Sequence, residues 1–456
     1  MIYRISAIAL SLMLTGCLSL DPDYQRPAAP VPAVWPGLTA DGSQPVVLRN
    51  WQQVMSDSRL QNVVARALNS NRDLRKAISD IAEAKALYGE ERASLFPTLS
   101  AGLSSTRSRT TDAGVSGSAE ASGSVSSFEI DLFGHNRSLS RAAKETWLAS
   151  EFTAQNTRLT LIAETATAWI TLATDNSNLA ISRQTMESAS NTLAITQRRL
   201  AAGVADGTDV NEAMTVYQSA RASVASYQTL VAQDRNALTL LVGESVPDAL
   251  LPGTLEGLAD NAIAIVPAGL SSSLLLRRPD VQEAEHNLKS ANADIGAARA
   301  NFFPTLSLTS SAGVASGSLS SLFSHGANVW SFAPSLSLPL FAGGTNVAAL
   351  KYAEAEKEGL IAAYEKAIQS GFKDVADALA RRATLNEQMD AQRQYVAAAQ
   401  RSLTLAQRAW QAGTGDYLTV LTDQRTLWSA QPELVALQQT DLNNRITLWQ
   451  SLGGGG

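Results

Sequence analysis

The chain carries one short motif twice, and this repeat governs what it can fold into. Residues 93–100 read ASLFPTLS and residues 300–307 read ANFFPTLS, so that the two Phe-Pro pairs lie 207 residues apart. The correspondence extends outward to Ala202-Gly203 and Ala412-Gly413. A chain that repeats itself over about 200 residues has built one structural unit twice.

Each copy changes its hydrophobic period at this motif. From Ser58 to about Ser94, apolar residues recur at the three- and four-residue spacing of a helix. Pro97 ends this pattern, because the residue before a proline avoids the α region. After it, apolar and small polar residues alternate. We therefore predict a helix-to-strand junction at Pro97 and, by correspondence, a second one at Pro304.

The alternating segments predict four strands, at about 97–107, 123–133, 304–315 and 328–341, with a polar loop over 105–124. Their length suits a tilted membrane strand, although a soluble sheet alternates too. Four strands are fewer than the roughly eight of the smallest membrane barrel, and open sheet edges are not tolerated in lipid. We therefore predict that several chains share one barrel, and favour a trimer with about 12 strands over a dimer with about eight.

A long helix is predicted after each strand pair. Residues 137–202 contain neither Pro nor Gly and would span about 100 Å. A heptad seam runs along this segment, through Leu159, Ile162, Ala166, Trp169 and Ala173. Turns at Gly203 and Gly413 should lead into return helices. Hairpins this long exceed what a globular core needs, so we expect them to pack into a bundle or tube.

The N-terminus has the features of an export signal over residues 1–16. Arg4 precedes an apolar run, and small residues precede Cys17, the only cysteine in the chain. Leu14-Thr15-Gly16-Cys17 resembles a bacterial lipobox, which implies a lipid anchor on Cys17 and, with Leu18 after it, delivery to the outer membrane. The alternative is an ordinary signal with an incidental cysteine. Residues 17–56 are rich in proline and predict an extended strap.

Composition and motifs exclude several classes of function. The net charge is −6 and no basic block stands out, which argues against a nucleic-acid partner. His135, His286 and His325 lie far apart, and neither H-E-x-x-H nor G-x-S-x-G occurs. We predict no enzyme, no metal site and no cofactor besides the lipid. A structural coiled-coil lipoprotein would leave the strand pairs unexplained, and a general porin would lack the long hairpins.

Taken together, the motifs resemble the TolC-like outer-membrane efflux duct family, in its lipidated branch that serves resistance-nodulation-division tripartite pumps. Besides the lipobox and the repeated motif, the resemblance rests on the segments D-Y-Q-R-P at 23–27, N-R-D-L at 71–74, F-E-I-D-L-F at 128–133, R-R-P-D-V at 277–281 and L-G-G-G at 452–455. These segments cover the chain from end to end.

The resemblance implies an α+β membrane protein that forms a homotrimeric 12-stranded barrel continued by a periplasmic helical barrel. It implies a passive exit duct that binds a periplasmic adaptor and, through it, an inner-membrane transporter. The cargo would be drugs or other small toxic compounds, with copper or silver efflux and type I protein secretion as alternatives. Repeat 1 would cover 57–250 and repeat 2 273–452, joined by an equatorial linker at 251–272 and followed by a glycine tail at 453–456.

The resemblance also implies sites at the two inter-helix turns. These tips would contact the adaptor through Ala202, Gly203, Val204, Ala412, Gly413 and Thr414. Small residues suit this role, because they let another helix tip approach the backbone closely. Both glycines also suit a helix C-cap, and the two interpretations are compatible.

The segment that enters the last helix would line the periplasmic constriction. Leu418 and Arg425 match the family's ring-forming leucine and gating arginine, whereas Thr419 and Thr422 stand where acids are common. Asp423 is a further gate candidate, but it lies about 100° around the helix from Thr422, a rotation that can take it away from the pore. Asp209 occupies an acidic gate position of the first repeat. We expect a less acidic gate that depends more on Leu418, with Asp209 paired to Arg425 or Arg408.

Overall fold

The structure is a computed structural model, which describes residues 19–35, 50–111, 114–258, 262–265 and 271–455. The predicted signal at 1–16 and the lipid site at Cys17 lie outside these residues. The chain divides into two compact units, each drawn from both repeats: Met1–Ala29, Ile78–Thr153 and Asp280–Ala367 form unit 1, and Pro30–Ala77, Ala154–Pro279 and Ile368–Gly456 form unit 2. Among the described residues, no helix is long and apolar enough to cross a membrane.

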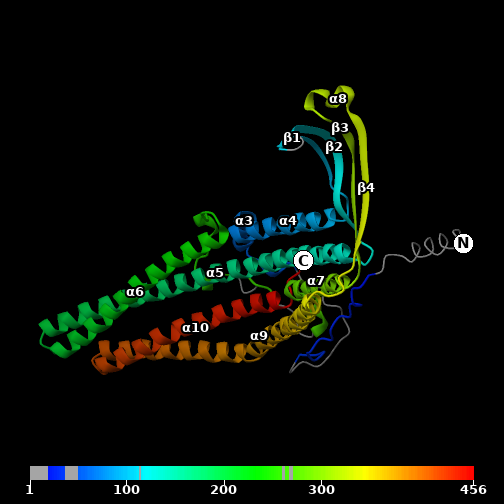
Figure 1. The fold of residues 1–456 in the computed structure, drawn as a ribbon. Helices are drawn as coiled ribbons and strands as arrows, with labels where there is room; N and C mark the ends of the chain where they lie inside the picture. The colour runs from blue at the N-terminus through cyan, green and yellow to red at the C-terminus, as the bar shows by residue number, and fades with distance from the viewer. Residues whose placement is uncertain (1–18, 36–49, 112–113, 259–261, 266–270, 456) are drawn as a thin grey trace. The chain divides into compact units, whose positions relative to one another are not determined.

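Unit 1 contains a single antiparallel sheet (Figure 1). Its strands are β1 (Leu99–Thr110), β2 (Gly114–Ile130), β3 (Thr305–Ser316) and β4 (Ala327–Ser337), hydrogen-bonded in the order β1-β2-β3-β4. The short α8 (Leu322–His325) lies in the connection between β3 and β4. Both repeats thus contribute one hairpin to a common sheet, whose outer strands β1 and β4 each leave one edge without a strand partner among the described residues.

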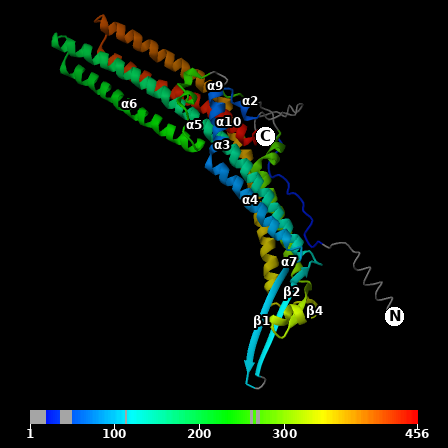
Figure 2. The same cartoon turned by 90° about the horizontal axis from the view of Figure 1, so that it is seen from above.

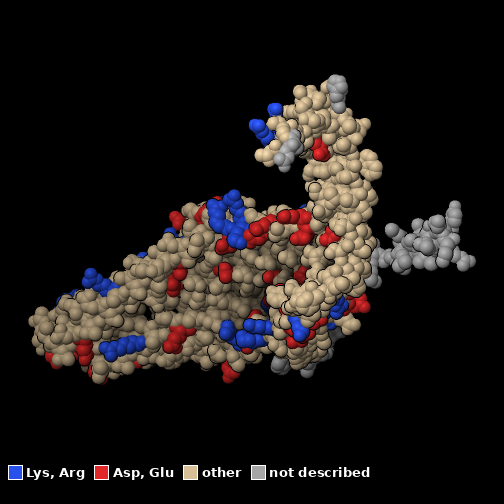
Figure 3. Space-filling view, in the orientation of Figure 1, with Lys and Arg blue, Asp and Glu red and all other residues tan. Residues whose placement is uncertain are grey.

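The register gives the sheet two chemically distinct faces. Leu103 pairs with Ala121, Ala121 with Val314, and Phe332 with Ser310, all on one face. The opposite face carries mostly Ser, Thr and Gly, together with Glu120. On the first face, henceforth the apolar face, the most exposed large side chains are Leu99, Leu103, Trp330, Phe332 and Leu336. Figure 3 shows a sheet surface with very few charged side chains.

A β-bulge keeps the two faces consistent along β2. The pairing shifts between Val125 and Phe128, and Ser127 adopts a left-handed φ of 50°. Without the extra residue, strict alternation after Val125 would put Glu129 on the apolar face. With it, Phe128 pairs with Leu308 on that face, and Glu129 pairs with Ser307 on the polar face.

The predicted loop over 105–124 was wrong, because β1 continues to Thr110 and β2 begins at Gly114. Twelve consecutive residue pairs join the two strands, from Leu99 with Val125 to Thr110 with Gly114. Ser, Gly and Ala indicate loops in soluble proteins, but here they form a sheet with one polar face. The alternation of small and polar side chains was too weak to reveal the strand.

The repeated Phe-Pro motif lies where a helix passes into a strand in each copy. The helix α4 (Arg72–Ala93) is followed by one tight turn in which the Phe96 amide donates to the Ala93 carbonyl at 3.0 Å. After α7 (Pro279–Ala300), Phe303 makes the same bond to Ala300 at 2.9 Å. Pro97 and Pro304 then lead into β1 and β3, as predicted.

Unit 2 is built mainly of two long antiparallel hairpins, and the first helix of each begins in unit 1. One hairpin pairs α5 (His135–Ala201) with α6 (Gly207–Val242), and the other pairs α9 (Thr345–Gln411) with α10 (Tyr417–Ser451); the members of each pair run side by side in Figures 1 and 2. The shorter elements are α2 (Trp51–Val54), α3 (Ser58–Ser70), η1 (Asp248–Leu250), η2 (Leu255–Gly257) and η3 (Ser272–Arg277). The predicted seam on α5 is buried, with Ala166, Trp169 and Ala173 fully inaccessible.

The single helix expected from Ser58 to Ser94 is broken at Asn71, which separates α3 from α4. The side-chain amide of Asn71 donates from Nδ2 to the carbonyl of Leu241 at 2.8 Å, near the end of α6. In the second repeat, the Arg278 guanidinium donates to the carbonyl of Ser451 at 2.5 Å, near the end of α10. Both bonds satisfy carbonyls that a helix end leaves free, so the same joint is built twice with different donors.

Candidate functional sites: the tips, the gate segment and the strap

The two inter-helix tips have nearly the same backbone. Gly203 and Gly413 adopt φ angles of 72° and 76°, a left-handed conformation that suits glycine. At the first tip the Val204 amide donates to the Arg199 carbonyl at 2.9 Å. At the second, Thr414 donates to Ala409 at the same distance. Each tip therefore closes its long helix with a Schellman-type turn.

The return helices begin with matched aspartates but different third residues. Asp206 accepts the amides of Thr208 and Asp209, and Asp209 accepts the Asp206 amide at 3.3 Å, which completes a capping box. Asp416 accepts the Thr419 amide at 2.6 Å, and Thr419 supplies no carboxylate in return. Hydrogen bonds from backbone amides hold the pKa of both capping aspartates below the usual value. Asp209 is thus partly engaged in capping; its pairing with Arg425 or Arg408 stays a prediction.

A buried cluster holds the two hairpins together behind the tips. Trp410 lies at its end, with the Arg199 guanidinium over its ring at 5.0 Å and the Tyr417 ring at 5.2 Å. The cluster continues through Leu193, Val216, Leu403, Val420 and Leu421. The apolar side chains of this cluster face inward. Val204, by contrast, is a large apolar side chain that remains 62% exposed at the first tip.

The predicted gate residues that belong to α10 divide over two faces of that helix. Leu418, Thr422 and Arg425 follow one another at four and three residues and all are exposed, with Leu418 at 64%. Thr419 is exposed as well. Asp423 instead accepts a hydrogen bond from Ser402 on α9 at 2.8 Å. Its carboxylate is therefore directed toward the neighbouring helix of its own hairpin, whereas the leucine, the threonines and the arginine remain available.

The N-terminal strap is fixed to unit 1 by a buried carboxylate that sequence reasoning did not identify. Glu285 on α7 is only 2% exposed, and it accepts hydrogen bonds from Arg26 Nη2 at 2.9 Å and Tyr24 Oη at 3.4 Å. Lys289 Nζ lies 3.0 Å from the same carboxylate. Tyr24 and Arg26 belong to the D-Y-Q-R-P motif, but no pattern in the sequence indicates their partner.

A second set of contacts holds the strap nearer to Cys17. Asp21 accepts the Ser138 hydroxyl at 2.6 Å and forms an ion pair with Arg141 at 2.6 Å. Asn292 donates to the carbonyl of Pro22 at 2.7 Å. Asp21 also lies so close to Gly296 that a Cβ there would be 2.8 Å from its carboxyl carbon. The strap thus occupies a fitted path over α5 and α7.

One carboxylate pair lies between α5 and α6. Burial, followed by the charge and hydrogen bond of Asp175, raises the pKa of Asp234 to about 6. Tyr227 lies close to the same pair, and burial together with the charge of Asp175 raises the pKa of that phenol. Two carboxylates that share one site resist simultaneous ionisation, so this contact is weaker when both are charged.

We expect Asp234→Asn to stabilise the protein near pH 7 by about 1 kcal/mol, allowing for solvent screening. Because the folded pKa lies above the ordinary value of 3.8, wild-type stability should fall as the pH rises from about 4 to about 6. The variant should lack this decline, and the two proteins should converge below pH 4. Thermal unfolding of the detergent-purified channel across this range measures the effect. Asp248→Asn, at a side chain 87% exposed, is the control; an equal change there would contradict the prediction.

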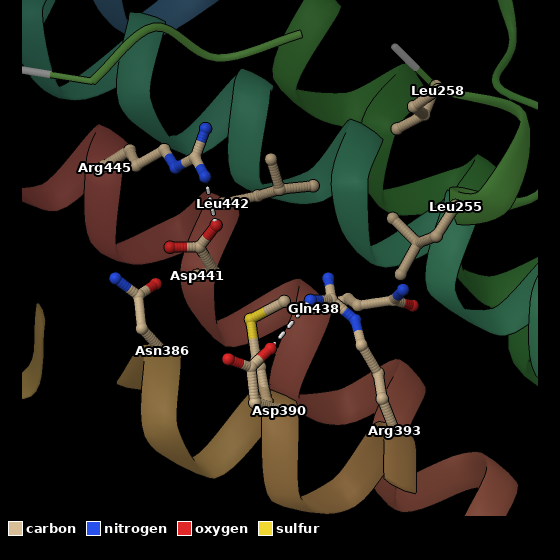
Figure 4. A pocket seen from close by; sticks show the side chains of 10 residues that line it. Leu255, Leu258, Asn386, Asp390, Arg393, Gln438, Asp441, Leu442 and Arg445 are labelled. Carbon is tan, nitrogen blue, oxygen red and sulfur yellow. Dashed lines mark hydrogen bonds and ion pairs between the residues drawn. The ribbon is translucent and has the colours of Figure 1, made fainter. Parts of the chain in front are cut away.

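A pocket of about 500 Å³ lies between α9, α10 and the η2 segment in unit 2 (Figure 4). Asp390 pairs with Arg393 at 3.3 Å, and Asp441 pairs with Arg445. Leu255 and Leu442 supply its apolar wall. In each pair the carboxylate and the guanidinium neutralise each other, so the pocket has no excess charge to attract an ion. Within the described residues, no group of three or more His, Cys, Asp or Glu could hold a metal.

Comparison with known proteins places the chain in a family. The family profile described as "Outer membrane efflux protein" matches residues 63–244 and 270–454, one segment for each repeat. The solvent efflux pump outer membrane protein SrpC of Pseudomonas putida is 42% identical over 97% of this chain and 96% of its own length. The cation efflux system protein CusC of Escherichia coli is 37% identical over 99% of each chain.

A solved structure agrees with the fold as a whole. The open state of the MtrE outer membrane channel of Neisseria gonorrhoeae superimposes with a TM-score of 0.85, at 34% identity over 96% of this chain and 98% of that one. Long helical hairpins joined to a two-faced sheet therefore define an outer-membrane channel, as predicted. The chain belongs to the outer membrane efflux protein family, and its role as the outer-membrane exit duct of an efflux pump is confirmed.

Proposed function

We propose that three copies of the chain close one 12-stranded barrel and form the passive exit duct of a tripartite pump. The observation that carries the proposal is the sheet, which has one apolar face, one polar face and two edges that no strand of the described part of the chain covers. In lipid, unpaired backbone groups at an edge cost several kcal/mol each. Pairing β1 of one copy with β4 of the next removes both edges, and threefold closure encloses a polar lumen.

Native mass spectrometry of the detergent-purified protein tests this assembly. The expected mass is three chains, and the expected activity in planar bilayers is a conducting pore. A stable monomer or dimer that conducts would overturn the proposal. At the N-terminus, a lipid on Cys17 would anchor the strap in the same membrane, and it should add the mass of its acyl chains to each protomer.

At the other end of the hairpins, the tips would meet a periplasmic adaptor that connects the duct to an inner-membrane resistance-nodulation-division transporter. Small residues at Ala202, Gly203, Ala412 and Gly413 leave the backbone open to another helix tip. All four are exposed, and so are Val204 and Thr414. The variants Val204→Cys and Thr414→Cys should form crosslinks to the adaptor, which would support this contact. The crosslinked species should be missing from cells that lack the adaptor.

The exposed face of α10 would form the closed constriction. Leu418 would pack against its copies around the threefold axis, and Arg425 would pair with Asp209. We expect Arg425→Glu to raise the leak conductance of reconstituted channels severalfold, because the new carboxylate would face Asp209 instead of neutralising it, and like charges close together repel. Arg198→Glu, on the last turn of α5, changes the same charge outside the proposed gate and should leave the leak unaltered. A leak that does not rise in Arg425→Glu would sink the proposed role of this arginine.

The cargo is proposed to be small toxic organic compounds, with cations as the second candidate. The solvent-pump relative is 42% identical and the cation-system relative 37% identical. A protein-secretion conduit is less well supported, because both relatives serve efflux. Deletion of the gene should sensitise the cells to toluene and hydrophobic antibiotics, with complementation by the wild type. Sensitivity to copper or silver salts alone would favour the cation duct instead.

A further inference from the structure

The outer end of the sheet carries two arginines that the duct function leaves unexplained. Arg107 and Arg109 on β1 are the only Lys or Arg residues in the four strands. They are two residues apart, and a strand places such residues on the same face. The register puts them on the face shared by Leu99, Leu103 and Val115, which is the apolar face. Both side chains are exposed.

Their height on the strand matches a lipid boundary. From Leu99 to Arg107 is eight residues, and from Leu99 to Arg109 ten, which corresponds to roughly 27 and 34 Å along an antiparallel strand. With a strand tilt of about 40°, these become roughly 21 and 26 Å along the membrane normal. The apolar band of an outer-membrane barrel is about 25 Å tall. Starting from Leu99, the guanidinium groups would therefore reach its outer edge, on the side that faces lipid in the proposed barrel.

Carboxylates of the described residues do not account for the pair. Glu120 and Glu129 lie on the polar face, because Glu120 pairs with Ser104 and Glu129 with Ser307. Residues 305–337, which form β3, β4 and their connection, contain no Asp or Glu that a second copy could offer from that hairpin. Among the described residues, neither arginine has an ion pair. Asp112, which follows β1 in the sequence, lies outside the described residues.

We propose that Arg107 and Arg109 bind the phosphate groups of a phosphorylated lipid headgroup in the outer leaflet. An arginine fork matches phosphate oxygens in a bidentate geometry, and a guanidinium at the apolar boundary is less screened than one in water. In the proposed trimer the hairpin occurs three times, so the barrel would carry three such sites around its rim. The inference adds a lipid contact to the duct and takes no part in conduction.

The test measures binding of bisphosphorylated lipid A to the full-length channel in phosphatidylcholine nanodiscs. Each basic residue near a charged membrane surface contributes about 1 kcal/mol, so Arg107→Gln with Arg109→Gln should weaken binding about 25-fold, or about fivefold for each arginine. Dephosphorylated lipid A should bind the wild type no better than it binds the double variant. Equal affinity of wild type and double variant for lipid A would overturn the proposal.

The period of the strand supplies a matched control. In the double-glutamine background, Thr106→Arg with Ser108→Arg restores the charge at the same height but on the polar face. We expect this variant to bind lipid A as weakly as the double variant; recovery to wild-type affinity would overturn the facial assignment and with it the proposal. Millimolar inorganic phosphate should not displace lipid A from the channel. Full displacement would identify a site for free anions instead. Trimer mass should stay unchanged in every variant, and conductance should stay unchanged in Arg107→Gln with Arg109→Gln, which separates this test from that of the duct.

Discussion

Replacing Glu285 by glutamine is expected to lower the free energy of unfolding by about 3 kcal/mol and to release the strap. The carboxylate is 2% exposed and receives hydrogen bonds or ion pairs from Arg26, Lys289 and Tyr24. Glutamine keeps the size of the side chain but leaves two cations without their counter-charge. Since the strap has no regular secondary structure of its own over the described residues 19–35, it depends on such contacts for its path.

The pH dependence gives this prediction a second readout. Burial alone would raise the pKa of Glu285, but the hydrogen bonds and charges of Lys289 and Arg26 outweigh it and hold the pKa below 4.5. A carboxylate with a lowered folded pKa stabilises the protein above its unfolded pKa and loses that contribution as the pH falls. The difference between wild type and Glu285→Gln should therefore be full at pH 7 and shrink below about pH 4.

Glu283→Gln is the matched control, two residues earlier on α7. Burial raises the pKa of Glu283, so neutralising it should leave stability unchanged or increase it slightly at pH 7. Thermal unfolding gives the stability, and limited proteolysis of residues 19–29 reports release of the strap. Equal losses in both variants, or an intact strap in Glu285→Gln, would contradict the role assigned to this network.

The sequence predicted those features that repeat or that obey a strong period. The two Phe-Pro junctions, the turns at Gly203 and Gly413 and the buried seam through Trp169 all lie where they were expected. Each depends on local chemistry: a proline that ends a helix, a glycine that accepts positive φ, or apolar residues at heptad spacing. Such signals survive in a single sequence because they require no knowledge of the tertiary partner.

The missed features depend on contacts between distant residues. Asn71 breaks the first helix, and its side chain donates a hydrogen bond to the carbonyl of Leu241, 170 residues later in the chain. Glu285 lies 259 residues from Arg26, and nothing near either residue indicates the pair. At the gate, the side chain of Asp423 is directed by Ser402 on the other helix of its hairpin. One usable signal for the break at Asn71 was the repeat itself, since Asn71 and Arg278 occupy equivalent positions in the two repeats.

The duplicated joint also yields the second large expected effect, at Gly243. This residue ends α6 with a φ of 80°, and a Cβ added there would lie 2.9 Å from the Ser70 carbonyl carbon and 3.2 Å from Asn71 Cα. Its counterpart Gly453 follows α10 with a φ of 94°, but a Cβ there would meet nothing closer than 3.5 Å. The left-handed backbone disfavours a side chain at both positions, whereas only at Gly243 would a Cβ also overlap another backbone segment.

We therefore expect Gly453→Ala to cost about 1 kcal/mol, the usual strain of a left-handed alanine, and Gly243→Ala to cost about 3 kcal/mol or more. The excess arises because the obstacle is backbone, which cannot rotate away as a side chain could. Thermal unfolding of both purified variants measures the difference, and hydrogen exchange at Asn71 and Arg72 should show the α3–α4 joint opening only in Gly243→Ala. Equal costs at the two glycines would mean that strain alone acts, and that the close approach of α6 to Asn71 contributes nothing to the joint.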